Sequence, residues 1–308
     1  MEEIISLHTA GSPTDPSVKW THLKPSDIAR LYEKKWGESI SNGTIKRLLK
    51  QMGYRKRKPN KSLATGKSPF RSQQFNIVFY FAYLFAEMEN NPILSMDTKK
   101  KERLGDLARS GKVLSREAPL VYDHDYAHLS EGKVVPGGLY DMKRNEGYVS
   151  IGTNNETAAF LADNLIWWWE TYGIHYYPDA TYLLLYCDCG GANAYRHHAF
   201  KKELQRVARY IGVRIVVVHY PPYCSKWNPI EHRLFSQMHK QADGAVFYSY
   251  EQVRQIFADT TTKTGLKVFV RINDKQYEKG LKITKEQIEE ERILYHSELP
   301  QFNYTILA

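Results

Sequence analysis

The chain has 308 residues, a length that allows about two domains and a sizeable hydrophobic core. An apolar fraction of 42% and an aromatic fraction of 13% exclude a disordered or low-complexity protein. The formal net charge of +9 is unevenly distributed: residues 1–75 hold 15 Lys and Arg against six Asp and Glu, whereas residues 76–308 hold 28 of each. We therefore expect a basic module joined to a neutral globular body.

The sequence lacks the features of an exported or membrane protein. It begins with the acidic pair Glu2 and Glu3 and shows no basic-then-apolar run of the secretory type. The most apolar stretch, residues 77–86, is too short to span a membrane. Three cysteines suit a reducing compartment better than a disulfide framework. We predict a soluble cytoplasmic protein with no membrane partner.

Two short amphipathic helices are predicted in the basic module. The first follows Pro25 and ends at Gly37, and the second begins at Ser41 and ends at Gly53. Two such helices with a tight turn fit a helix-turn-helix element that contacts DNA, and an ordinary helical hairpin with a solvated face is the alternative. In the first interpretation, DNA is contacted by the outward side chains of the second helix, Thr44, Lys46, Arg47 and Lys50.

A basic tract follows the second helix. Such a tract can neutralise phosphates or enter a minor groove, whereas a solvated linker is the alternative. Both interpretations put a domain boundary near residues 60–72, so we predict a DNA-binding module with its linker over residues 1–71 and a second domain over residues 72–308. The candidate DNA-binding residues of the tract are Arg55, Lys56, Arg57 and Lys58.

The second domain is predicted to alternate strands and helices. Strands are expected at residues 93–97, 147–152, 182–188, 214–219 and 266–272. Helices are expected at residues 72–89, 156–172, 195–211, from 250 onward and, as a charged helix, at 284–296. This order indicates an α/β fold in which helices cover both faces of a mixed sheet.

Two acidic residues end predicted strands. Asp97 closes the first strand, and Asp188 closes the third. A carboxylate at the end of an apolar strand is costly to bury unless it is paired or binds a metal ion, and two of them on neighbouring strands repel each other unless a hard cation lies between them. The alternative is that each acid caps a following turn. The pair is therefore a candidate metal site.

Glu231 is a third candidate, in a segment where a helix begins. Asn228 fits an N-cap, Pro229 fits the first helical position and Glu231 falls at the third. A Glu at this position can complete a capping box, and the local sequence alone favours that explanation. Because Glu231 also lies at the edge of the apolar face of the helix, it could instead face the sheet.

Four sequence blocks occur in a fixed order, at residues 95–102, 138–147, 188–193 and 219–235. Together they resemble the signature blocks of bacterial insertion-sequence transposases of the ISAzo type, in the mariner-like branch of the DDE superfamily. The resemblance runs from about residue 15 to the end of the chain. It implies a ribonuclease-H-like mixed sheet flanked by helices, preceded by a small all-α helix-turn-helix module. Carried over by position, Asp97, Asp188 and Glu231 match the three acids of the DDE triad.

This resemblance implies metal-dependent DNA cleavage at element ends and strand transfer to target DNA. Three carboxylates suit Mg²⁺ or Mn²⁺, and two ions roughly 4 Å apart can activate the attacking oxygen and stabilise the leaving one. Water attacks first, and the freed 3′-hydroxyl then attacks the target. The implied partners are double-stranded DNA and a second copy of the chain, in a homodimer or larger assembly associated with the nucleoid.

Four further residues are candidates for positioning DNA near the triad. Lys99 and Lys100 follow Asp97 and could neutralise phosphates at the scissile bond, although a solvated turn explains them equally well. Asn193 and Lys226 match the family blocks and are expected to position DNA.

The chain departs from the family pattern in two places. It retains about one helix-turn-helix element where a longer N-terminal region is usual, as expected of a truncated copy or of one with a misplaced start, and Ala192 stands where serine is usual. An inactive or truncated remnant that acts only as a sequence-specific DNA-binding protein is therefore the main alternative function. A nuclease of the same fold that acts on RNA–DNA hybrids is a further alternative, which the basic module and the transposase blocks disfavour.

Overall fold

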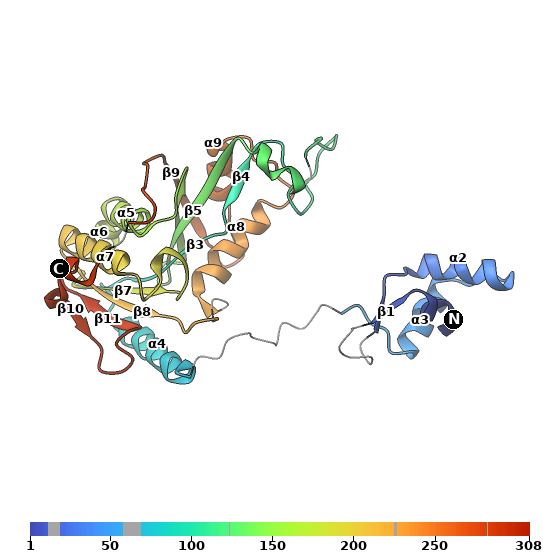
Figure 1. Cartoon of the computed structure of the whole chain (residues 1–308), viewed down its shortest axis with the longest axis horizontal. Coiled ribbons are helices and arrows are strands. Elements are labelled where there is room, and N and C mark those ends of the chain that lie inside the picture. The colour runs from blue at the N-terminus through green and yellow to red at the C-terminus, as the bar shows by residue number, and fades with distance from the viewer. Residues whose placement is uncertain (12–18, 58–68, 123, 225–226, 282) are drawn as a thin grey trace. The chain divides into compact units, whose positions relative to one another are not determined.

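The computed structural model describes residues 1–11, 19–57, 69–122, 124–224, 227–281 and 283–308. The chain divides into two compact units, Met1–Leu63 and Ala64–Ala308, and each is described by itself (Figure 1). Within the described residues, no helix is both long and apolar enough to cross a membrane.

The first unit is a small helical module with one hairpin. Its elements are α1 (Glu2–Leu7), β1 (Thr9–Gly11), β2 (Lys19–Thr21), α2 (Pro25–Trp36) and α3 (Asn42–Gln51). Ile5, Ile28 and Ile45 contribute one buried side chain from each helix to its core. Gly37 ends α2 in the left-handed conformation with φ 74°, and the Ser41 hydroxyl accepts a hydrogen bond from the Thr44 amide at the start of α3. The two predicted helices are confirmed, but the expectation of an all-α module is wrong, because β1 and β2 form an antiparallel pair. Helix α1 was not predicted either.

The second unit contains, among the described residues, a nine-stranded mixed sheet. Its strands are β3 (Ile93–Thr98), β4 (Glu102–Leu104), β5 (Gly132–Asp141), β6 (Glu146–Gly152), β7 (Tyr182–Cys187), β8 (Arg214–His219), β9 (Lys267–Asn273), β10 (Ile293–Tyr295) and β11 (Asn303–Ile306). The strand order is β10-β11-β8-β7-β3-β5-β6-β9, with β4 beside β5. Strands β3, β7 and β8 run parallel, and β5 is antiparallel to β3 and β6.

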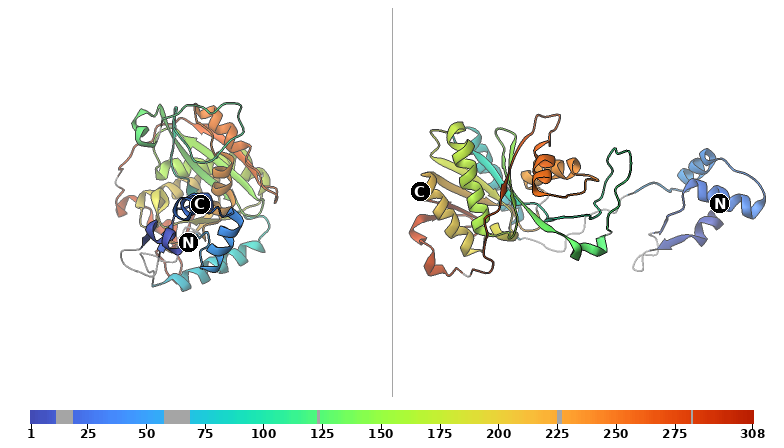
Figure 2. Two further views of the ribbon diagram at one scale, coloured as in Figure 1. Left: turned by 90° about the vertical axis from the view of Figure 1, so that its right-hand side faces the viewer. Right: turned by 90° about the horizontal axis from the view of Figure 1, so that it is seen from above.

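Helices cover both faces of this sheet (Figure 2). The main ones are α4 (Arg71–Ala86), α5 (Ala158–Trp168), α7 (His198–Ile211), α8 (Ser236–Gln241) and α9 (Tyr250–Ala258), with a short α6 (Ile174–Tyr176). Two π-helical segments, Trp169–Gly173 and Glu231–Phe235, extend α5 and lead into α8. The predicted α/β fold, a mixed sheet flanked by helices, is confirmed.

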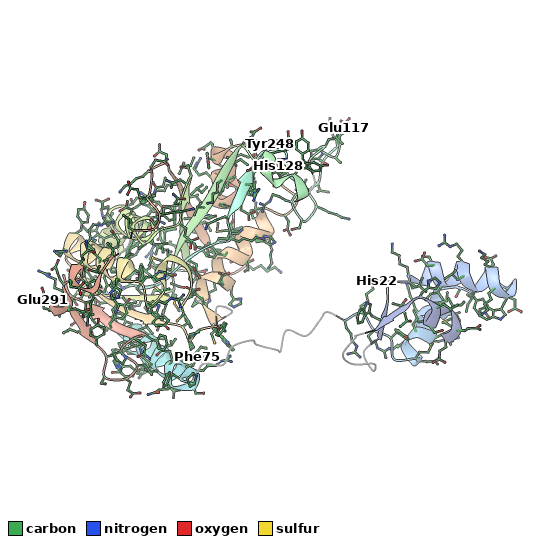
Figure 3. All side chains as sticks on the ribbon, viewed as in Figure 1. His22, Phe75, Glu117, His128, Tyr248 and Glu291 are labelled. Carbon is green, nitrogen blue, oxygen red and sulfur yellow. The ribbon has the colours of Figure 1, made fainter. Side chains whose placement is uncertain are left out.

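The side chains of β3 alternate between the two faces of the sheet. Leu94 and Met96 are fully buried in the cluster formed with α5 and α7. Ser95 and Asp97 therefore emerge on the other face, where α4 and the helix that contains α8 pack. On that face lies Phe75 of α4, which is labelled in Figure 3. Its ring contacts that of Trp227 edge to face, with 5.9 Å between the ring centroids.

Several segments differ from the prediction, which also lacked strands β4 and β11. The charged helix expected at 284–296 is wrong: this segment forms two short 3₁₀ turns, Lys285–Gln287 and Glu290–Arg292, followed by β10, because pairing with β11 at a sheet edge outweighs the local helical periodicity. Strand β5 was not predicted, since Gly137 and Gly138 break the pattern of a strand. A Cβ on Gly138 would lie 2.7 Å from the ring of Phe235, so glycine there allows the 231–241 helix to approach the sheet.

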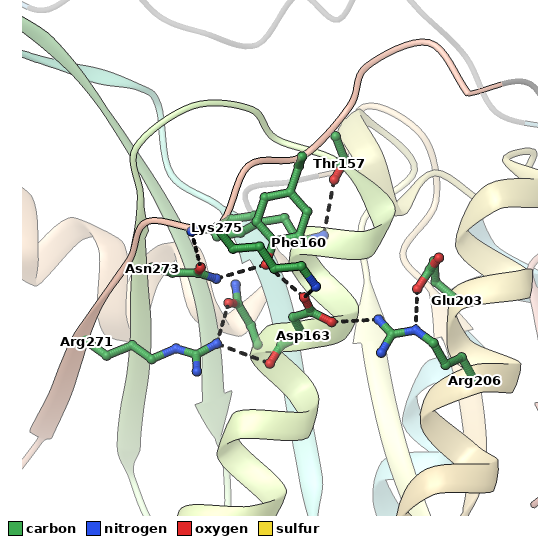
Figure 4. A network of polar contacts seen from close by, with 10 residues as sticks. Thr157, Phe160, Asp163, Glu203, Arg206, Arg271, Asn273 and Lys275 are labelled. Carbon is green, nitrogen blue, oxygen red and sulfur yellow. Dashed lines mark hydrogen bonds and ion pairs between the residues drawn. The ribbon is translucent and has the colours of Figure 1, made fainter.

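A closed polar network joins α5 to α7 and to the segment after β9 (Figure 4). The Asp163 carboxylate accepts hydrogen bonds from Arg206 at 2.7 Å, Lys275 at 2.6 Å and the Tyr277 hydroxyl at 2.9 Å. Arg271 donates to the Asp163 carbonyl. Although burial opposes ionisation of Asp163, these hydrogen bonds lower the pKa of its carboxyl below the ordinary value. The negative charge is thus compensated within the fold.

Candidate active site

Asp97 and Asp188 lie at the carboxyl ends of adjacent parallel strands. The register of β3 and β7 pairs Met96 with Cys187, so the two acids occupy the next positions on their strands. Met96 and Cys187 are both buried in the cluster on the α5 and α7 face. Because successive side chains of a strand alternate, both carboxylates emerge on the opposite face.

Hydrogen bonds of the Ser95, Asp97 and Asn228 side chains join β3 to the start of the helix that contains Glu231. The Ser95 hydroxyl donates to Asn228 Oδ1 at 2.5 Å and accepts from the Ile230 amide at 3.3 Å. Asn228 Nδ2 donates to Asp97 Oδ2 at 3.0 Å. Ser95, a residue of another element, therefore caps the helix start, and the Asn228 side chain holds Asp97. The sequence analysis assigned Asn228 only to the helix cap. It missed the contacts of Asn228 with Ser95 and Asp97, because contacts between residues so far apart in the chain leave no local pattern in the sequence.

The three acids lie close enough to influence one another electrostatically. Burial and the negative charge of Asp188 raise the pKa of Asp97 well above its ordinary value, and the charge of Glu231 adds to this. Burial followed by the charge of Asp188 also raises the pKa of Glu231. Burial is the main cause that raises the pKa of Asp188, and Glu156 contributes. The fold thus concentrates negative charge that it only partly compensates.

Backbone and buried groups fix the orientation of both aspartates. Asp97 Oδ1 accepts from the Thr98 amide at 2.8 Å, and Asp188 Oδ1 accepts from the Gly190 amide at 3.0 Å. His219 is fully buried, and burial lowers the pKa of its imidazole to about 4, so the ring is neutral near pH 7. Its Nδ1 lies 2.8 Å from the Asp188 carbonyl oxygen, so Nδ1 carries the proton and donates. His219 therefore positions the main chain at Asp188.

The chemistry of the donor set fits a hard divalent cation. Asp97, Asp188 and Glu231 offer only oxygen atoms, and ionised carboxylates that raise one another's pKa gain stability from a cation between them. In the part of the chain that the structure describes, no three His, Cys, Asp or Glu side chains come close enough to hold a metal ion as a complete group. The match to a divalent cation therefore rests on two facts: the donors are all carboxylates, and they lie on the same face of the sheet.

A groove of about 520 Å³ adjoins Glu231 and contains both predicted lysines. Lys99 is 8% exposed and forms an ion pair with Glu102 at 2.6 Å. Lys100 is exposed and lines the same groove. Arg109 also lines this groove and forms an ion pair with Glu102 at 2.5 Å. The sequence analysis did not select Arg109, because the irregular segment between Glu102 and Arg109 carries no periodic signal.

A fourth carboxylate, Glu156, contacts Thr98, the residue after Asp97, and was also not predicted. It accepts a hydrogen bond from the Thr98 hydroxyl at 2.8 Å and forms an ion pair with Lys101 at 2.9 Å. Although burial acts against it, these two contacts lower the pKa of Glu156. Glu156 is thus neutralised by the chain itself, unlike the three acids of the site.

Comparison with known families identifies the family of the chain. A model of the family described as Rhodopirellula transposase DDE domain matches residues 1–308. The chain belongs to that DDE transposase family. No curated protein matches the chain.

Among solved structures, the chain is similar to a Mos1 transposase paired-end complex with left transposon end, with a TM-score of 0.46 and 14% identity over 76% of this chain and 65% of that one. A pre-cleavage Mos1 transpososome gives a TM-score of 0.46 and 12% identity, over 80% of this chain and 71% of that one. The catalytic domain of Mos1 mariner transposase gives 0.41 and 12%, over 63% and 80%. The chain therefore spans less than two thirds of the Mos1 chain in the first of these complexes.

The other predicted DNA-binding residues occupy different environments. Lys46, Arg47 and Lys50 are exposed on α3, whereas Thr44 is half-buried with its hydroxyl 3.0 Å from that of Ser41. Arg55 donates to the Lys50 carbonyl at 2.7 Å and so closes the C-terminal end of α3.

Exposure separates the remaining candidates of this set. Lys56 and Arg57 are exposed. Asn193 is 2% exposed, and its amide donates to the Met96 carbonyl, a contact that holds the loop after Asp188 against β3. Lys58 and Lys226 lie outside the described residues.

Proposed function

We propose that the chain is a DDE transposase of a bacterial insertion sequence, which cleaves DNA at the element ends and transfers the strand to target DNA in a metal-dependent reaction. The observation that carries the proposal is the placement of Asp97 and Asp188 on adjacent parallel strands, with Glu231 tied to the first of them through Asn228. Membership of the DDE transposase family supports the same function.

The proposed metal ligands are Asp97, Asp188 and Glu231, and two Mg²⁺ or Mn²⁺ ions are the proposed cofactors. When bound, such ions supply Lewis acidity, which lowers the pKa of the attacking hydroxyl and neutralises the charge that develops on the phosphate oxygens. Each Asp97 oxygen accepts one hydrogen bond from the protein and retains further lone pairs for a ligand. Thr98 and Asn228 therefore orient Asp97 without occupying it.

The chain's own residues position the reacting strand. Asp188 is fixed by the Gly190 amide on one side and by His219 on the other. Lys99 and Lys100 put positive charge in the groove beside Glu231, where it attracts a phosphodiester. Water and then the freed 3′-hydroxyl attack phosphorus in line at the same carboxylates, so no covalent intermediate between protein and DNA is needed.

The proposed DNA-binding module of this transposase, with its linker, covers residues 1–71 and contains α2 and α3 as a helix-turn-helix element. Lys46, Arg47 and Lys50 support this role, because all three are exposed on one helix. Pairing two element ends in one complex further requires at least a homodimer on DNA. In this proposal the protein works in a bacterial cytoplasm, associated with the nucleoid.

A cleavage assay tests the proposed activity. The full chain is incubated in Mg²⁺ with a duplex that carries the element end, taken from the DNA that flanks its gene, and 3′-hydroxyl products are measured. We expect cleavage by the unmodified chain and losses on the order of 10³-fold in Asp188→Asn and Glu231→Gln, because each variant removes a proposed ligand.

Asp259→Asn is the matched control for these variants. Asp259 is exposed at the end of α9 and accepts a hydrogen bond from Gln255, far along the chain from the three acids. Its cleavage is expected to equal that of the unmodified chain. No metal-dependent cleavage by the unmodified chain would reject the enzyme and leave a DNA-binding protein without catalytic activity.

A further inference from the structure

Three charged side chains form a largely buried cluster beside Glu231. The Glu102 carboxylate lies between two cations: Lys99 Nζ is 2.6 Å from Oε1, and Arg109 Nη1 is 2.5 Å from Oε2, with Nη2 3.4 Å from Oε1. The exposed fractions of the three side chains are 8% for Lys99, 16% for Glu102 and 13% for Arg109. Glu102 therefore holds an ammonium and a guanidinium next to each other.

The charges of this cluster do not cancel. Two cations and one carboxylate leave an excess of one positive charge within the cluster, and Lys99 also acts on Glu231, where its charge opposes the rise in the pKa of that carboxyl. Arg109 stacks over the Phe247 ring at 4.0 Å, which fixes the plane of the guanidinium. Its Nε is buried and has no hydrogen-bond partner among the described residues. The cluster thus has both a spare charge and a spare donor.

The position of the cluster of Lys99, Glu102 and Arg109 indicates which anion it binds. Lys99, Glu102 and Arg109 line the groove of about 520 Å³ that also contains Glu231. Lys99 is two residues from Asp97 in the chain, so the spare charge lies next to the proposed site of phosphodiester cleavage. Planar guanidinium and ammonium groups held side by side are suited to phosphate oxygens.

We propose that Lys99 and Arg109, held together by Glu102, form a phosphate-binding subsite that takes a backbone phosphate of the DNA strand next to the scissile one. This inference rests on the proposed function for the identity of the strand. Because Glu102 orders both cations before the ligand arrives, binding costs less side-chain entropy than it does with free surface lysines. Glu102 is a positioning residue, and Lys99 and Arg109 contact the phosphate.

Inorganic phosphate tests the subsite without DNA or metal. The full chain in chelator is titrated with phosphate, and the dissociation constant is measured by ³¹P NMR for four proteins: the unmodified chain, Arg109→Gln, Glu102→Gln and Arg254→Gln. We expect Arg109→Gln to weaken binding at least fivefold. Glu102→Gln is expected to tighten binding about threefold, because the glutamine oxygen can still accept a hydrogen bond from the cations and order them, while the charge of the cluster rises by one. Arg254, paired with Glu251 on α9, is the control and is expected to leave the constant unchanged.

The opposite signs separate this proposal from a purely structural role. If the cluster only stabilised the fold, Arg109→Gln and Glu102→Gln would both break the same ion pairs and would change phosphate binding in the same direction or not at all, and that result overturns the subsite. The sign for Glu102→Gln decides the question even if Arg109→Gln fails to fold. Phosphate binding that behaves as expected in a chain without cleavage activity would reject the transposase and keep the subsite.

A second measurement connects the subsite to DNA. Binding of a 30-base-pair duplex is followed against salt for the unmodified chain and Arg109→Gln. Loss of one phosphate contact is expected to reduce the slope of log K against log salt by about 1. An unchanged slope would show that Arg109 does not reach the DNA backbone and would overturn the proposal.

Discussion

Two acids on opposite faces of the same sheet, the half-buried Asp163 and the buried Asp97, have opposite electrostatic environments. Asp163, on α5, accepts hydrogen bonds from Arg206, Lys275 and Tyr277, and these contacts lower its pKa. Asp97, on β3, is buried beside two other acids, and its pKa is raised well above the ordinary value. Compensated charge of the first kind contributes to stability, whereas uncompensated charge of the second kind is typical of a functional site.

The comparison also explains why the fold tolerates the second arrangement. Asp97 is not left without partners, because the Thr98 amide and the Asn228 side chain donate to it. These neutral donors orient the carboxylate, but they do not cancel the repulsion from Asp188. In the proposed function a cation supplies the missing charge, and its binding would stabilise the folded chain.

The largest expected effect is a difference in DNA cleavage between variants of Asp97 and Asp163. Asp97→Asn is expected to lower DNA cleavage about 10³-fold or more, because a proposed metal ligand is lost. Asp163→Asn is expected to keep cleavage within about threefold at a temperature where it stays folded. The measurement is the rate of 3′-hydroxyl formation in Mg²⁺. Equal losses in the two variants would contradict the assignment of separate roles.

Asn228 offers a smaller effect on the same acid. Asn228→Ala removes the donor to Asp97 and the partner of Ser95, and we expect cleavage to fall by about 10- to 100-fold, as is usual when a group that orients a ligand is lost. The loss should shrink as Mg²⁺ is raised, because a misoriented carboxylate binds the ion more weakly. The Mg²⁺ dependence of the rate tests this, and a loss that does not respond to Mg²⁺ would assign Asn228 to fold stability alone.

Folding stability should change in opposite directions for the two acids. Asp163→Asn is expected to lower the free energy of unfolding by about 1.5 kcal/mol, a modest value because Arg206 and Lys275 are partly exposed and screened. Asp97→Asn is expected to stabilise the metal-free chain, because the buried charge and its repulsion disappear. Urea unfolding in chelator measures both. Destabilisation by Asp97→Asn comparable to that of Asp163→Asn would contradict the contrast.

The smallest effect concerns pH. The folded pKa of Asp97 is raised, so its contribution to stability is fully present below the unfolded pKa of about 3.9 and is lost as the pH rises through the raised folded value. The folded pKa of Asp163 is lowered, so its contribution is present above about 3.9 and is lost as the pH falls through the folded value. In chelator, the free energy of unfolding of Asp97→Asn should therefore rise above that of the unmodified chain as the pH rises from 4 toward 7. The free energy of unfolding of Asp163→Asn should approach that of the unmodified chain as the pH falls. Parallel curves would contradict both assignments.

The acids of the site could be predicted from the sequence, whereas the contacts that hold them in place could not. Asp97 and Asp188 could be found because each follows a short apolar strand, a local pattern with a period of two. That the two strands are adjacent depends on the parallel pairing of β3 with β7, between segments about 90 residues apart. The family resemblance, rather than periodicity, identified Glu231.

Other features had no local signal. The partners of Asp163 come from positions 206, 275 and 277, so its helix position alone did not distinguish it from any other acid. Strand β5 contains Pro136 followed by two glycines, which predict a turn, yet its partners β3 and β6 hold it extended. In the segment 284–296 the opposite occurred: a charged helical period was overridden by the pairing of β10 with β11. Tertiary contacts decided each case.

Binding of Mn²⁺ to the full chain, measured by electron paramagnetic resonance in the absence of DNA, tests the central claim most directly. The claim is that Asp97, Asp188 and Glu231 are left uncompensated because a divalent cation neutralises them. We predict that the unmodified chain and Asp163→Asn bind Mn²⁺ with the same affinity and that Asp97→Asn binds it at least tenfold more weakly. Equal binding by Asp97→Asn and the unmodified chain would contradict the account.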